Sequence, residues 1–127
     1  MKYSLRSPFA RMVLVLFFAI LALTVVGRMV KLTGAAIYCD GFPFCAPDHP
    51  LGWLKQTHVI LGGIASIFMS LVLRKAWREQ REQSVLLPLT TILGVMFFGQ
   101  VLVGAMQVIQ SYPAHLVFLH TLTTIAL

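Results

Sequence analysis

Apolar residues in this chain are gathered into long runs, and the charged residues are bunched between them. Asp, Glu, Lys and Arg are absent from residues 12–27, 56–73 and 83–114. A helix of about 20 mostly apolar residues crosses the hydrocarbon of a bilayer, and snorkelling Lys and Arg at its ends allow a shorter core. The pattern therefore predicts membrane-spanning helices near 11–29, 54–73 and 86–109, with a fourth helix over 113–127.

The fourth segment differs from the others in length. Residues 114–127 follow Pro113 and would extend roughly 21 Å as a helix, which is short of a full crossing. The segment also ends on an apolar run at Leu127. We therefore expect the chain to stop inside this helix and the native chain to be longer. The predicted fold is an all-α integral membrane protein, a single domain over 1–127 that forms an up-down four-helix transmembrane bundle with a truncated fourth helix.

Composition excludes an ordinary soluble domain and suggests an orientation. The chain is 58% hydrophobic and 11% charged, and its mean hydropathy is +0.85. Lys and Arg are concentrated beside the two ends predicted to share one side of the membrane, which the positive-inside rule makes cytoplasmic. The N-terminus is then cytoplasmic, with an outer loop at 30–53, an inner loop at 74–85 and an outer turn at 110–113. These basic residues are Lys2, Arg6, Arg11, Arg74, Lys75, Arg78 and Arg81.

The basic residues after the second predicted helix do not indicate a nucleic-acid-binding site. Residues 74–78 form a basic stretch that is compatible with RNA or anionic lipid, but no folded domain accompanies it. We interpret it as a juxtamembrane anchor. The start of the chain also does not predict a cleaved signal peptide, because its long apolar run lacks a small-residue cleavage site.

The two cysteines lie in the predicted outer loop. Cys39 and Cys45 enclose Asp-Gly-Phe-Pro-Phe, and an oxidising compartment with an even cysteine count favours an intraloop disulfide. Such a short closed loop contributes about 2 kcal/mol in the chain-entropy model. A structural disulfide and a redox-active pair that exchanges with thiol partners both remain open. Zinc is disfavoured, because His49 and nearby Asp residues supply too few further ligands.

Two histidines, His58 and His120, lie inside predicted spans. An ionisable side chain in hydrocarbon costs roughly 2.5 kcal/mol or more, so it is a functional hypothesis by default. The residues lie roughly 6 Å and 10 Å below the outer surface on helices that both run inward. Facing side chains of a bundle core build cofactor sites, and neutral imidazole is a common ligand of haem iron. We therefore predict axial haem ligation by both, with interhelical hydrogen bonds as the alternative.

Neighbouring positions on the predicted helices support a haem site. Gly62 and Ala65, with Met69 below, follow His58 on one face and would leave a groove for a flat ring. The third helix supplies a polar and small-residue stripe, and Thr124 is the i+4 neighbour of His120; the stripe comprises Gln100, Gly104 and Gln107. His49 and His115 are interpreted as loop or interfacial residues, with a haem-propionate contact by His115 left open.

These residues together resemble the heme A synthase family. Residues 27–34, Gly-Arg-Met-Val-Lys-Leu-Thr-Gly, are similar to its Gly-x-x-Val-Arg-x-Thr-Gly pattern at the exit of the first helix. Residues 39–45 resemble its cysteine-bracketed, proline-containing outer loop. Residues 100–108 resemble its third helix, and Leu119-His120 the histidine of its fourth. The similarities run in the same order over nearly the whole chain.

The resemblance implies a membrane oxidoreductase that oxidises the C8 methyl of haem O to the formyl of haem A for cytochrome oxidase. It implies haem b, o or a held by His58 and His120, with Cys39 and Cys45 as the outer disulfide or thiol pair. Family members usually have two similar four-helix halves, and this chain resembles the N-terminal one. The expected partners are haem O, lipid, and a second half, another copy or a larger complex.

Two residues depart from the family pattern beside the helix-two histidine. The family tends to place Glu three residues before that histidine and Arg directly after it, where this chain has Lys55 and Val59. Loss of the carboxylate favours an alternative, a non-catalytic haem b subunit of a respiratory or photosynthetic complex. A quinone-linked thiol oxidoreductase that uses the cysteine pair is a third reading. Catalytic residues are not assigned by the sequence.

Overall fold

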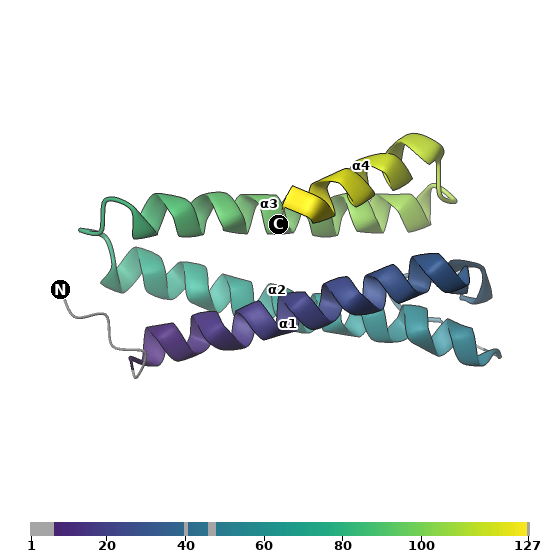
Figure 1. Ribbon diagram of the computed structural model, residues 1–127, viewed down its shortest axis with the longest axis horizontal. Helices are drawn as coiled ribbons and strands as arrows, with labels where there is room; N and C mark the ends of the chain where they lie inside the picture. Colours follow the sequence, from purple (N-terminus) through teal and green to yellow (C-terminus); the bar gives the residue numbers. More distant parts are fainter. Residues whose placement is uncertain (1–6, 40, 46–47, 127) are drawn as a thin grey trace.

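The computed structural model describes residues 7–39, 41–45 and 48–126, and within these it is helical, with no strand. Four α-helices and one short 3-10 helix follow each other along the chain (Figure 1). The predicted all-α character is confirmed. The elements are α1 (Pro8–Thr33), η1 (Ala35–Tyr38), α2 (Pro50–Glu79), α3 (Leu86–Ile109) and α4 (Ala114–Ala126).

The first two helices extend beyond the predicted apolar spans because local capping chemistry sets their ends. At the start of α1, the Ser7 side chain accepts a hydrogen bond from the backbone N–H of Ala10 at 3.1 Å, and Pro8 occupies the first turn. Gly34 ends the helix in the left-handed conformation at φ 64°, which a residue without a Cβ adopts at low cost. At both ends, α1 therefore extends beyond the apolar span predicted from the sequence.

The helices associate as two pairs. The most extensive contact joins α1 to α2, the next joins α3 to α4, and α2 with α3 connects the pairs. In Figure 1 each helix runs back along the one before it, so the η1 loop and the α3–α4 turn lie at the same end of the molecule. That turn contains two residues with positive φ, Ser111 and Tyr112. The end that holds these two connections is called the loop end below.

The apolar core lies on the side of the histidines that faces away from the loop end. It comprises one side chain from α1, three from α2 and one from α3: Leu16, Ala65, Met69, Val72 and Phe97. Gly94 of α3 lies directly against the Leu73 side chain of α2, because an added Cβ there would lie 2.7 Å from Cδ1 of Leu73.

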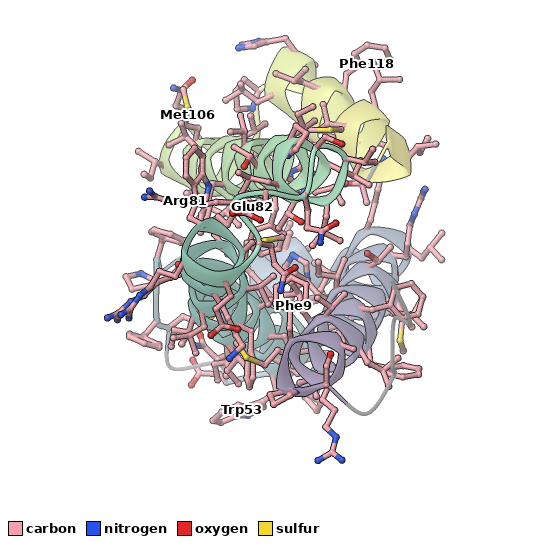
Figure 2. All side chains as sticks on the ribbon, turned by 90° about the vertical axis from the view of Figure 1, so that its left-hand side faces the viewer. Phe9, Trp53, Arg81, Glu82, Met106 and Phe118 are labelled. Atoms are coloured by element: carbon pink, nitrogen blue, oxygen red, sulfur yellow. A yellow bond between two sulfur atoms is a disulfide. The ribbon has the colours of Figure 1, made fainter. Side chains whose placement is uncertain are left out.

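Large apolar side chains cover much of the outer surface. Phe118 points away from the bundle in Figure 2, and Phe17, Phe18 and Leu21 of α1 are also exposed. Three helices, α1, α2 and α3, are long and apolar enough to cross a membrane, whereas α4 is apolar but shorter. The predicted multi-pass character is thus supported by length and composition, and the exposed apolar residues are those that lipid would cover.

Candidate functional site

The imidazole of His58 is enclosed between α1 and α2 by a glycine of the opposite helix. A Cβ atom added at Gly27 of α1 would lie 2.7 Å from Cε1 and 3.1 Å from Nδ1 of His58. Any other residue at Gly27 would therefore collide with the ring. The backbone carbonyl of Leu23, one turn before Gly27, also faces the His58 ring. The first helix pair thus holds one imidazole against a bare stretch of backbone.

The second helix pair repeats this arrangement. A Cβ added at Gly104 of α3 would lie 3.0 Å from Cε1 of His120, which is carried by α4. The backbone carbonyl of Gln100, again one turn before the glycine, faces the His120 ring. Each histidine therefore belongs to the second helix of a pair and packs on a glycine of the first.

Each of the two imidazoles has one buried nitrogen without a hydrogen-bond partner, and the two rings interact electrostatically. Nδ1 of His58 and Nδ1 of His120 are the buried side-chain polar atoms without a hydrogen-bond partner in the described part of the chain. A buried polar group without a partner is costly and calls for an explanation, such as a bound ion or cofactor. The rings are also close enough to interact electrostatically, although they are 62 positions apart in sequence. The fold therefore brings the two predicted residues within electrostatic range of each other.

The two imidazoles suit a metal whose other ligands come from a bound cofactor. Among the described residues, no cluster of three or more His, Cys, Asp or Glu side chains is arranged to hold a metal ion. Two imidazoles alone leave a bare transition metal under-coordinated, whereas a porphyrin supplies four nitrogens and leaves two axial positions. The unpartnered nitrogens and the two glycines, which keep Cβ atoms away from the rings, both fit such a group.

Hydrogen bonds of Gln100 fix the position of α4 along the axis of α3. Its Nε2 donates to the backbone carbonyl of His120 at 2.7 Å and also contacts the Thr124 hydroxyl, and its Oε1 accepts from the Thr123 hydroxyl. The polar stripe predicted on the third helix thus includes one residue that binds the histidine's own backbone and a second, Gly104, that receives its ring. Gln107 is buried nearer the loop end.

The groove expected below His58 is occupied by core packing. Ala65 and Met69 are buried in the apolar core, and Gly62 lies beside Leu23 at an ordinary contact distance. The open backbone beside His58 belongs to Gly27 instead, whose place beside His58 the sequence does not predict. A signal was present: Val-Gly-x-Met occurs at residues 26–29 and again at 103–106.

The cysteine loop is closed and clamped onto α2 directly before His58. Cys39 and Cys45 form a disulfide, with Cα atoms 5.6 Å apart, as predicted. Buried Lys55 donates from Nζ to the Cys39 carbonyl, and Oε1 of buried Gln56 accepts from the Cys45 N–H at 3.2 Å. Nζ of Lys55 also lies 5.6 Å from the centroid of the Tyr112 ring, a cation–π contact with the α3–α4 turn. Asp40 lies outside the described residues.

The other two histidines have separate positions. His49 caps α2, because its Nδ1 accepts from the Leu51 N–H at 3.1 Å, and its ring stacks on Tyr38 with centroids 4.2 Å apart. Both residues line a cavity of about 510 Å³ beside the disulfide, away from His58 and His120. His115 is exposed in the first turn of α4.

Replacing Lys55 by Glu is expected to destabilise the protein. The new carboxylate would face the Cys39 carbonyl in a buried position, and breaking a buried charged contact costs about 3–5 kcal/mol. We expect a lower midpoint of thermal unfolding in detergent and faster reduction of the disulfide. Arg74→Glu, at an exposed position near the other end of α2, is the matched control and should change neither. A Lys55→Glu protein as stable as wild type would contradict the clamp.

A scan against protein-family models, a search of curated proteins and a search of solved structures each find no match to this chain.

Proposed function

We propose that this chain is a multi-pass membrane protein that binds haem through His58 and His120. The observation that carries the proposal is the pair of enclosed imidazoles, each against a glycine and each with Nδ1 unpartnered. Leaving two such atoms unsatisfied in one small bundle is costly unless a ligand uses the rings. Interhelical hydrogen bonding to Ser, Thr or Gln side chains, the competing explanation, leaves these two nitrogens without a partner, although a backbone carbonyl of the opposite helix faces each ring.

The proposal extends to orientation in the membrane. The bundle would run up and down across the bilayer with the N-terminus cytoplasmic, as the distribution of Lys and Arg suggests. The loop end, with the disulfide, would lie on the outer side, where an oxidising compartment supports that bond. Both histidines would then sit in the outer half of the membrane.

The reaction proposed first is that of a heme A synthase-like oxidoreductase. The resemblance of the first helix exit, the cysteine loop and the histidine positions supports it. Bound haem would supply the redox chemistry for oxidising the C8 methyl of haem O with oxygen. The chain's own part would be to hold the haem through the imidazoles of His58 and His120, to keep the site apolar, and to set the position of α4 along α3 through Gln100.

A second candidate, a non-catalytic haem b subunit, is favoured by one observation. Lys55 stands where the resemblance expects a carboxylate, and its ammonium is committed to the Cys39 carbonyl. The carboxylates among the described residues are Asp48, Glu79 and Glu82, and all three are exposed. None of them lies in α3 or α4. A protein of this kind would bind haem by both histidines and transfer electrons without changing the porphyrin.

One experiment separates the candidates. The protein is purified from cells that supply haem O, reduced in the presence of oxygen, and the extracted haem is analysed by chromatography and pyridine-haemochrome spectra. Formation of haem A supports the synthase. A bis-histidine spectrum with unchanged haem O supports the second candidate. Protein that binds no haem contradicts both.

A further inference from the structure

Lys31 links the two helix pairs at the level of the histidines. Its Nζ donates to the hydroxyl of Thr121 at 2.8 Å, which joins α1 to α4 across 90 positions of sequence. Lys31 lies one helical turn after Gly27, the glycine against His58, and Thr121 directly follows His120. The ammonium is also within electrostatic range of the His120 ring. One cation is therefore held close to the His120 imidazole, one helical turn past the glycine against which His58 packs, on the loop-end side.

This ammonium has no carboxylate partner in the described part of the chain. The ion pair recorded there, Lys75 with Glu79, lies at the opposite end of α2. Of the other described cations at the loop end, Lys55 is buried on the Cys39 carbonyl, and Arg28 is exposed on α1. The Lys31 side chain remains exposed apart from its bond to Thr121, so two of its three N–H donors are available.

We propose that Lys31 and Thr121 form a carboxylate-binding site for the ligand that His58 and His120 hold. The inference rests on the proposed function, in which that ligand is a haem and the carboxylate is one of its propionates. Charge-assisted hydrogen bonds are about twice as strong as neutral ones, and a cation at the rim of an apolar site is screened less than one in water. The site fixes which edge of the ring faces the loop end.

The test compares haem b with its dimethyl ester, which has the same ring and iron but no free carboxylates. Both are titrated into detergent-solubilised protein lacking haem, and affinity is read from the absorbance change of bis-histidine ligation. Wild type is expected to bind haem b roughly tenfold more tightly than the ester, as one charge-assisted hydrogen bond warrants. Lys31→Met is expected to lose this preference while keeping the bis-histidine spectrum, and Lys31→Arg to retain it.

Arg28→Met is the matched control, since it removes an equal charge three residues earlier on the same helix. It should keep the tenfold preference. Equal affinity of wild type for the two ligands, an unchanged preference in Lys31→Met, or an equal loss in Arg28→Met would each overturn the inference while leaving haem ligation intact. Absence of any bis-histidine spectrum in wild type would overturn the proposed function as well. Because each ratio is measured within one protein, a general loss of stability cancels.

Discussion

Replacing His58 or His120 by alanine is expected to remove most of the haem from the purified protein. Each ring supplies one of the two axial ligands in the proposed site, and each is enclosed by its own helix pair. Loss of an outer-shell partner of a metal ligand typically costs 10–100-fold in affinity, so loss of the ligand itself should cost at least about 100-fold. Any haem that remains in a single variant should be five-coordinate and high-spin, and the double variant should hold none.

His115→Ala is the control for this result. His115 lies in α4 five residues before His120, but its side chain is exposed. Pyridine-haemochrome spectra normalised to protein should show wild-type occupancy for His115→Ala and strongly reduced occupancy for the other two. If all three variants retained wild-type haem and its low-spin spectrum, the axial assignment would be wrong, and the unpartnered nitrogens would need another explanation.

Adding a single methyl group at Gly27 is expected to impair haem binding nearly as severely as loss of a histidine. The Cβ of Gly27→Ala would lie 2.7 Å from Cε1 of His58, closer than side-chain atoms approach, so the ring or the helix must shift. Gly104→Ala places its Cβ 3.0 Å from Cε1 of His120 and should act in the same direction but less strongly. Haem occupancy and the position of the reduced α-band measure both effects.

The chain offers matched glycine controls, one on the helix that carries His58 and one on the helix of Gly104. Gly63 of α2 and Gly99 of α3 have open space where a Cβ would be added. Alanine in place of glycine in a helix favours the helix by roughly 1 kcal/mol, so these two variants should be at least as stable as wild type and fully loaded. Equal haem occupancy in Gly27→Ala and Gly63→Ala would show that close approach of α1 to His58 is not required for binding.

Several features followed from local sequence alone. The four helices were predicted because long apolar runs leave their backbones no partner in lipid other than themselves. The Cys39–Cys45 disulfide was predicted from a short loop with two cysteines, and the structure pairs them. The apolar runs predict α1 and α2 to be shorter than they are. These runs indicate only the part of a helix that would lie in hydrocarbon, whereas the capping residues Ser7, Gly34 and His49 set the helix ends.

Other features depended on contacts that no local pattern contains. The helices are apolar on nearly every side, so their hydrophobic periodicity says little about which face turns inward. Lipid is as apolar as a core side chain, and close packing of small residues decides the rotation of each helix. The sequence places Gly62 and Ala65 on the helix face of His58, but it does not predict that Gly27 of another helix packs on the His58 ring or that Lys31 contacts Thr121.

By itself, the sequence determined a helical chain with segments long and apolar enough to cross a membrane and two histidines in apolar surroundings, because composition and run length act along the chain. Only the tertiary structure decided that Gly27 and Gly104 each receive one imidazole, and that Lys55 holds the cysteine loop. Those outcomes require residues tens of positions apart to meet at particular helix rotations. The free energy that selects the rotations comes from side-chain contacts between helices, which form only on folding.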